Sequence, residues 1–184
     1  MRPRGYSSEA VILARRDYSE ADRILVVYTK ESGKRYLMAK GVRKPSSRKR
    51  GSLEVFSYIK FAAMRGKDLD LMTEVETIEN YSGIRRNLKK VTLAYYFMET
   101  VGRTSHENEP NAEIYNLILN FMERLEKEKS LKSLRLEFIQ KLLELGGFWP
   151  KGKLLEDHDR KIEEVMEKIP SSVRVGKRML EHFS

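Results

Sequence analysis

The sequence of 184 residues contains no cysteine, only three histidines and a single tryptophan. Without cysteine there is no disulfide framework, no thiolate metal site and no thiol nucleophile, which is typical of a reducing compartment. The histidines His106, His158 and His182 are too far apart in sequence for a metal-binding or catalytic-triad motif. We therefore expect a protein without a metal or another cofactor.

Long apolar runs are also absent. The basic N-terminus is not followed by the apolar segment of a signal peptide, and no run approaches the roughly 20 residues of a membrane span. With 40% hydrophobic residues, the chain can still form a folded core. We expect a soluble cytoplasmic protein with no membrane partner.

Motifs for nucleotide binding are missing as well. The sequence has neither a phosphate-binding loop ending in Gly-Lys-Ser/Thr nor a Gly-x-Gly-x-x-Gly motif. Four carboxylates, at Asp68, Asp70, Glu74 and Glu76, are candidates for the metal ligands of a nuclease. They alternate with apolar residues at 69, 71 and 75, which favours the solvent face of a half-buried strand. We expect no enzymatic activity and keep a nuclease as an alternative.

Charge, in contrast, is plentiful and unevenly placed. The formal net charge of +9 lies entirely in residues 1–50, which contain 14 Lys and Arg but 5 Asp and Glu. Residues 34–50 hold eight basic residues and no acidic one. An otherwise neutral chain with one cationic end indicates a polyanionic partner such as nucleic acid or anionic lipid.

The first 80 residues show the two-residue alternation of β-strands. Turn signals separate the strands that this pattern predicts, and residues 41–51 form a basic, exposed loop between the third and the fourth strand. The predicted strands cover residues 11–14, 24–28, 34–42, 53–61 and 69–76. Five short strands favour a small closed barrel, because closure removes exposed strand edges.

The periodicity changes to that of helices near Asn80-Tyr81-Ser82-Gly83. The predicted helices cover residues 91–101, 114–125, 131–143, 154–169 and 172–182. The third ends at Gly146-Gly147, where glycine can adopt the left-handed cap, and Trp149 beyond it is read as a packing residue. The fold class is therefore α+β, with a five-stranded barrel domain over residues 1–80 and an all-α helical domain over residues 81–184.

Cations and aromatic rings share faces of the strands around the basic loop. A run of lysine and arginine is more often only a solvated surface. Here the alternation also places Tyr36 beside Lys34 and Lys40 before the loop, and Phe56 and Tyr58 beside Lys60 after it. A single nucleic-acid strand needs both kinds of residue, because cations hold phosphates while flat rings stack on bases. Burial of the two later rings against the helical domain is the alternative, which stays open for Phe56.

This reasoning gives a set of candidate nucleic-acid-binding residues. They are Lys34, Arg35, Tyr36, Lys40, Arg43, Lys44, Arg48, Lys49, Arg50, Tyr58 and Lys60.

Several segments resemble the RecO family of bacterial recombination mediators. The matching segments at the front are Ala10-Val11-Ile12-Leu13, residues 17–25, residues 29–33, Ala39-Lys40-Gly41-Val42-Arg43-Lys44 and Ser47-Arg48. Residues 134–147 followed by Phe148-Trp149-Pro150 are similar to that family's helix ending in a Leu-Gly-aromatic-x-Pro turn. The resemblance implies an N-terminal OB-fold and a non-enzymatic protein that binds single- and double-stranded DNA. It further implies annealing of complementary strands and, with a RecR partner, help for RecA in displacing single-stranded-DNA-binding protein (SSB).

One departure from the family pattern is plain. Many members carry a four-cysteine zinc site after this turn, whereas Lys151-Gly152-Lys153 here leads directly into Leu154-Leu155. We therefore expect no zinc and a shortened helical domain. The leading hypothesis is a DNA-binding mediator of recombination and repair, and the alternative is an OB-fold protein that binds structured RNA or the ribosome.

Overall fold

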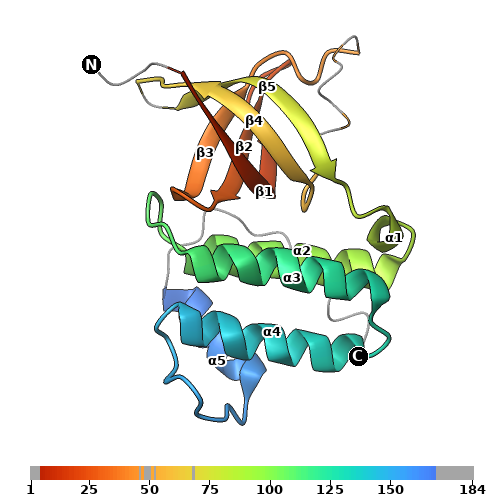
Figure 1. Cartoon of the computed structure of the whole chain (residues 1–184), viewed down its shortest axis with the longest axis vertical. Coiled ribbons are helices and arrows are strands. Elements are labelled where there is room, and N and C mark those ends of the chain that lie inside the picture. Colours follow the sequence, from red (N-terminus) through yellow and green to blue (C-terminus); the bar gives the residue numbers. More distant parts are fainter. Residues whose placement is uncertain (1–4, 46, 48–50, 52, 68, 169–184) are drawn as a thin grey trace. The chain divides into compact units, whose positions relative to one another are not determined.

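A computed structural model describes residues 5–45, 47, 51, 53–67 and 69–168 of the chain (Figure 1). The chain divides into two compact units. The first runs up to Asn80 and also includes Glu107–Asn111, while the second comprises Tyr81–His106 and the chain from Ala112 onwards. We refer to them as the barrel unit and the helical unit and describe each on its own.

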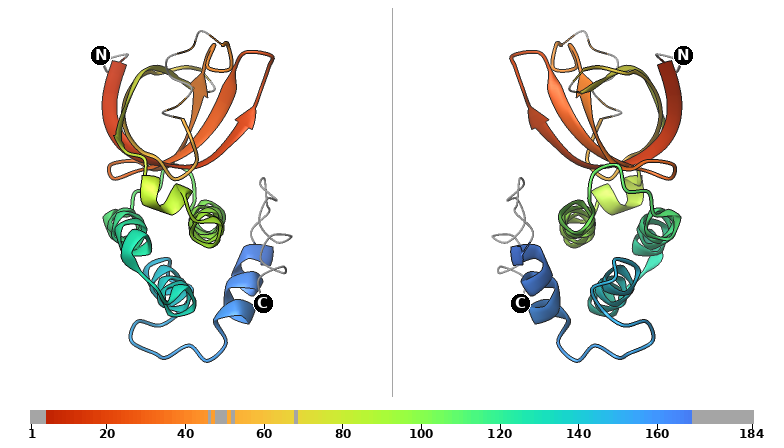
Figure 2. Two further views of the ribbon diagram at one scale, coloured as in Figure 1. Left: turned by 90° about the vertical axis from the view of Figure 1, so that its right-hand side faces the viewer. Right: turned by 90° about the vertical axis from the view of Figure 1, so that its left-hand side faces the viewer.

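The barrel unit contains five strands that close into a barrel. The strands are β1 (Gly5–Asp17), β2 (Arg23–Thr29), β3 (Gly33–Ala39), β4 (Tyr58–Met64) and β5 (Asp70–Glu79). Their order around the barrel is β1-β2-β3-β5-β4, and β4 returns to β1 (Figures 1 and 2). The pairing of β3 with β5 is parallel, and the other four pairings are antiparallel. This is the OB-fold arrangement, so the predicted fold class is confirmed.

Alternate residues of the strands fill the barrel with one apolar core. Its buried members are Ala10, Ile12, Leu25, Val27, Leu37, Ala39, Val42, Leu53, Ile59, Phe61, Ala63 and Met72. Three β-bulges adjust the alternation, one in β1 between Ile12 and Ala14 and two in β5, opposite Tyr58 and Ile59 and opposite Ala62 and Ala63. A bulge adds one residue to a strand, so the residues beyond it switch faces.

The bulge in β5 opposite Ala62 and Ala63 overturns the predicted faces of that strand. Met72 belongs to the core and Val75 packs against it, although the two are three residues apart. The first half of β5 therefore turns Asp70 inward together with Met72, and Asp70 is buried. The prediction that Leu71 and Val75 share one face, with Asp70 on the solvent side, is wrong because the extra residue reverses the pattern.

The fourth strand starts later than predicted. Residues 53–57 form no strand, and β4 begins at Tyr58. Phe56 has a φ of 59°, and its N–H donates to the carbonyl of Ile12 over 2.8 Å. Its side chain is fully buried. The prediction that Phe56 shares an exposed face with Tyr58 and Lys60 is therefore wrong, because its ring is buried.

The helical unit contains five helices in the described part of the chain (Figure 2). They are α1 (Ser82–Arg85), α2 (Leu88–Thr104), α3 (Ala112–Lys127), α4 (Leu131–Leu145) and α5 (His158–Lys168). Three buried rings join α2, α3 and α4. Phe97 stacks on Phe138 with centroids 3.9 Å apart, and Phe121 meets Phe138 edge-on at 5.3 Å. No helix of the described residues is long and apolar enough to cross a membrane.

The ends of the later helices differ in part from the prediction. Gly147 has a φ of 75° just after α4, which confirms the predicted glycine stop. Trp149 is partly exposed, and its indole N–H donates to the carbonyl of Lys153 over 2.7 Å. The next helix begins at His158 and not at residue 154, and Leu154 is 80% exposed. The predicted helix over residues 172–182 lies outside the described residues.

Candidate nucleic-acid interface

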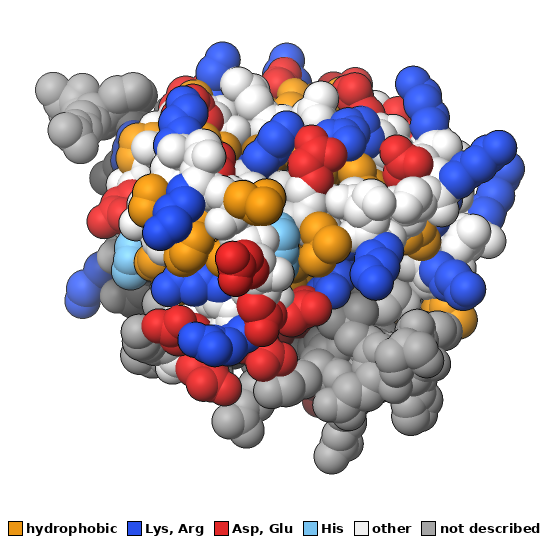
Figure 3. Space-filling model, turned by 90° about the horizontal axis from the view of Figure 1, so that it is seen from below, with side chains coloured by type: hydrophobic (Ala, Val, Ile, Leu, Met, Phe, Trp, Pro, Cys, Tyr) orange, Lys and Arg blue, Asp and Glu red, His pale blue; other side chains and the backbone are white. Residues whose placement is uncertain are grey.

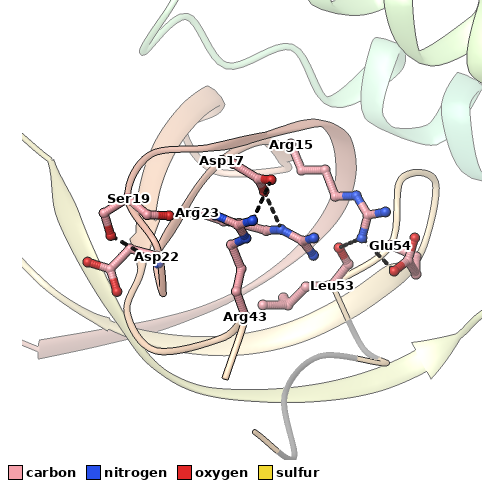
Figure 4. A network of polar contacts seen from close by, with 8 residues as sticks. All are labelled: Arg15, Asp17, Ser19, Asp22, Arg23, Arg43, Leu53 and Glu54. Carbon is pink, nitrogen blue, oxygen red and sulfur yellow. Dashed lines mark hydrogen bonds and ion pairs between the residues drawn. The ribbon is translucent and has the colours of Figure 1, made fainter. Parts of the chain in front are cut away.

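The start of the basic loop lies against the connection between β1 and β2. The backbone N–H of Gly41 donates to the carboxylate of Asp22 over 2.8 Å, and that of Arg43 donates to the carbonyl of Ala21 over 3.0 Å. The guanidinium of Arg43 donates to the carbonyl of Ser19 over 2.6 Å (Figure 4). Two segments twenty residues apart in sequence therefore form one loop cluster at this part of the barrel.

Asp17 at the end of β1 holds this cluster together electrostatically. Its carboxylate accepts a hydrogen bond from Arg23 over 2.9 Å and lies 3.3 Å from the guanidinium of Arg43 (Figure 4). The hydrogen bond from Arg23 is the largest of several effects that lower the pKa of Asp17. Because two guanidinium groups share this carboxylate, the cluster keeps an excess of positive charge.

The loop cluster exposes one aromatic ring and several cations. Tyr18 is 62% exposed, and Arg16, Lys40 and Lys44 are exposed as well. OB-folds bind oligonucleotides on the β2–β3 face and on the loops between β1 and β2 and between β4 and β5. Arg16 and Tyr18 are absent from the residues predicted by sequence, where this segment reads only as a polar connection. The signal that could have found them is a tyrosine two residues after a pair of consecutive arginines, at the point where a strand ends.

Lys34 and Tyr36 lie on β3 with their side chains half-buried. Burial lowers the pKa of the Lys34 amine, against a smaller opposing effect of Glu107. The carbonyl of Lys34 accepts from the N–H of Asn108 over 3.0 Å. Tyr36 is paired with Val26 of β2, so it stands on the face that OB-folds use.

Arg35, also on β3, is engaged by a buried carboxylate. Its guanidinium lies 2.5 Å from Asp70, which also accepts from the hydroxyl of Tyr6 over 2.7 Å and from the N–H of Gly66 over 3.2 Å. The side chains of Arg35 and Asp70 are 22% and 10% exposed. Burial first, and then Asp70, raise the pKa of Tyr6 to about 12. This cluster ties β1, β3 and β5 together through the guanidinium of Arg35.

Tyr58 and Lys60 lie on β4 in acidic surroundings. Lys60 pairs with Glu9 of β1 on one side and with Glu76 of β5 on the other, and the hydroxyl of Tyr58 donates to Glu9. The barrel order places β5 between β3 and β4. The two groups of residues predicted to share one surface are therefore separated by the strand that carries Glu74 and Glu76.

The remaining predicted residues divide as follows. Lys40, Arg43 and Lys44 join the loop cluster, whereas Arg48, Lys49 and Arg50 lie outside the described residues. Within the described part of the chain, no three His, Cys, Asp or Glu residues are placed to hold a metal ion. Of the four carboxylates considered for a nuclease, Asp70 is bound to Arg35 and Asp68 lies outside the described residues.

The barrel topology and the following helices define this chain as an OB-fold protein with a helical second unit. Two family models match it, described as Recombination protein O N terminal over residues 1–81 and Recombination protein O C terminal over residues 85–152. The chain belongs to the RecO family.

Curated relatives support the same family. The chain is 35% identical over 145 residues to the DNA repair protein RecO of Pelotomaculum thermopropionicum. This alignment covers 79% of this chain and 56% of the relative. It is equally similar to DNA repair protein RecO of Desulforamulus reducens, over the same shares. The match to DNA repair protein RecO of Dehalococcoides mccartyi is 33% over 149 residues, covering 81% of this chain and 59% of the relative. The chain thus spans a little over half the length of these relatives.

Proposed function

We propose that this chain is a non-enzymatic recombination mediator in DNA repair that binds single- and double-stranded DNA at the loop cluster of its barrel. The observation that carries the proposal is the clamp of Arg43 on Ser19 and Asp17. It holds the start of the basic loop, at Gly41 and Arg43, against the connection that carries the exposed ring of Tyr18, so cations and a flat ring meet on a fold that commonly binds oligonucleotides. The names of the relatives support the role in DNA repair.

Binding would divide into two kinds of contact. Lys40, Lys44 and the other cations of the basic loop would hold phosphates, while Tyr18 and Tyr36 would support unstacked bases. The acidic strand with Glu74 and Glu76 would repel a polyanion and so confine it to the β2–β3 side. Complementary strands whose phosphate charge is neutralised and whose bases are exposed can anneal without a chemical step.

The family also suggests partners for this activity. We propose a RecR-like partner, SSB and, indirectly, RecA, with the chain acting at the nucleoid. The direct experiment is annealing of complementary strands coated with SSB, which the chain should accelerate. Affinity for a folded RNA equal to or above that for single-stranded DNA would favour the structured-RNA alternative. Cleavage of labelled DNA with Mg²⁺ or Mn²⁺ that is lost on changing Glu74 and Glu76 would favour the nuclease.

Neutralising the basic loop should flatten the salt dependence of DNA binding. Each cation that contacts a single strand contributes about 0.7 to the slope of log affinity against log salt. Changing Lys40 and Lys44 to Gln should therefore lower the slope by up to about 1.4 for single strands, and weaken duplex binding too. Arg43 is left in place because it holds the cluster together. Fluorescence anisotropy at several salt concentrations measures the slope.

The matched control changes two exposed lysines of the helical unit, Lys151 and Lys153, to Gln. It removes the same charge and should leave the slope almost unchanged. Equal slopes for the two variants would mean that the basic loop is only a solvated surface.

Removing the ring of Tyr18 should weaken single-strand binding selectively. Stacking on a base contributes about 1–3 kcal/mol, so Tyr18→Ala should lower the affinity for single strands roughly 5- to 150-fold. Duplex binding should change little because duplex bases are already stacked. Tyr18→Phe keeps the ring and should restore binding, and Tyr95→Ala, at a ring 37% exposed on α2, is the control. An equal loss for duplex and single strands would contradict stacking at this position.

A further inference from the structure

The helical unit carries a basic surface of its own. It lies where α1, the first turn of α2, the end of α3 and the start of α4 come together. Its basic residues, called here the helical basic patch, are Arg85, Arg86, Lys89, Lys90, Lys127, Lys129 and Lys132. In Figure 3, several of the basic side chains on this face lie at the right-hand side, where Figure 1 shows α1 and the beginnings of α2 and α4.

Two contacts through Glu126 join the segments of the patch. Its carboxylate accepts from the N–H of Gly83 over 3.0 Å, and its backbone carbonyl accepts from the amine of Lys90 over 2.7 Å. These contacts fix the α1–α2 corner beside the end of α3, and α4 starts four residues after α3 ends. The patch is therefore a single surface built from segments about forty residues apart.

Two nearby carboxylates, Glu126 and Glu128, offset only part of the charge of the seven basic residues, so the patch keeps an excess of positive charge. Glu126 is bound to the N–H of Gly83, and Glu128 accepts from the N–H groups of Lys129 and Ser130 over 2.8 and 3.0 Å. Arg86, Lys89, Lys127, Lys129 and Lys132 are exposed. Among the ion pairs of the described residues, none involves any of these five.

The placement of the charge does not serve the stability of the helices. Cations near the N-terminus of a helix interact unfavourably with its dipole. Yet α2 carries Lys89 and Lys90 in its first turn and α4 carries Lys132, and neither helix has an acidic residue there. A bound polyanion would offset this repulsion.

We propose that the helical basic patch binds the phosphodiester backbone of a second DNA segment. The proposal goes beyond the barrel site because it places a separate contact surface on the other unit. Leu88, at 64%, is the large apolar side chain that is exposed in the segments of the patch. Among the described residues of these segments, no aromatic ring is exposed. Phosphates are thus the recognised group, and the patch does not distinguish single strands from duplexes. One chain then holds two DNA segments, one on each unit.

The test neutralises the patch in the full chain. The patch variant changes Lys89, Lys127, Lys129 and Lys132 to Gln, and the matched control changes the exposed Lys141, Lys151, Lys153 and Arg160 of the same unit. The patch variant should lower the salt slope by up to about 2.8 for single strands and about 3.6 for duplexes, and the control should change it little. Circular dichroism verifies that both variants keep their helices.

A bridging assay tests the second segment itself. Two oligothymidine strands, one with a donor dye and one with an acceptor dye, cannot pair with each other. Wild-type protein should bring them together and raise energy transfer, whereas the patch variant should bind one strand and lose most of the transfer. Equal salt slopes and equal energy transfer for the patch variant and the control would overturn the proposal. That result would indicate that the patch binds an acidic protein instead of DNA. The Lys40 and Lys44 variant tests the barrel site separately, so failure of one surface is distinguishable from failure of the other.

Discussion

Alanine at Gly33 is expected to destabilise the protein by about 3 kcal/mol or more, whereas alanine at Gly41 should cost about 1 kcal/mol. Both glycines have the positive φ that favours glycine, at 65° and 68°. A Cβ at Gly33 would lie 2.1 Å from the carbonyl oxygen of Glu109, which belongs to the backbone and cannot turn away. At Gly41 the nearest atom, Cδ of the Lys44 side chain, is 4.0 Å away.

Urea unfolding of the two variants measures the difference. Because their backbone conformations match, Gly41→Ala accounts for the left-handed strain, and the excess at Gly33 reports the close approach of Glu107–Asn111 to the β2–β3 turn. The N–H of Asn108 also donates to the carbonyl of Lys34 in this region. Equal losses for the two variants would show that the segment does not press on the turn in solution.

Removal of the Asp70 carboxylate is expected to cost about 3 kcal/mol. Loss of one partner of a buried ion pair costs about 3–5 kcal/mol, and the lower end applies because Arg35 keeps some contact with water. Asp70→Ala strands the guanidinium of Arg35 and leaves the hydroxyl of Tyr6 without its acceptor. The double variant Asp70→Leu with Arg35→Met removes both charges and should recover much of the loss. Thermal unfolding of the single and double variants provides the comparison.

The same double variant examines the role of Arg35 in binding. If Arg35 serves the barrel structure, the double variant should keep the wild-type salt slope for single-stranded DNA. A slope lower by about 0.7 would return Arg35 to the set of phosphate contacts.

Sequence periodicity predicts the order of strands and helices well, but not where a strand changes face. Strand β3 and helices α2 to α4 show a sustained two-residue or helical repeat, so their apolar faces follow directly, whereas β1 contains a bulge and four consecutive buried residues. The bulge in β5 opposite Ala62 and Ala63 leaves no mark in the sequence, since Thr73 is an ordinary strand residue. Phe56 continues an apolar alternation without being in a strand, because its backbone bonds to Ile12 at the margin of the ladder.

The candidate site was only partly predictable for a similar reason. The run of cations in residues 34–50 is visible in the sequence, but the acceptors that each one finds depend on the closed barrel. Arg35 and Arg43 look alike in the sequence. One is bound to the buried Asp70, and the other clamps a loop through Ser19 and Asp17. Strand order likewise decides that Lys60 meets glutamates, although its distance in sequence from the basic loop is short.

The inclusion of Glu107–Asn111 in the barrel unit also has a consequence for synthesis on the ribosome. The last residue that the barrel unit needs, Asn111, is translated 31 residues after Asn80. At about 5–20 residues per second, this corresponds to a delay of roughly 2–6 s between the last strand and the segment that completes the unit. All residues of α2 are translated during that interval, so a whole element of the helical unit is synthesised before the barrel unit has its last segment.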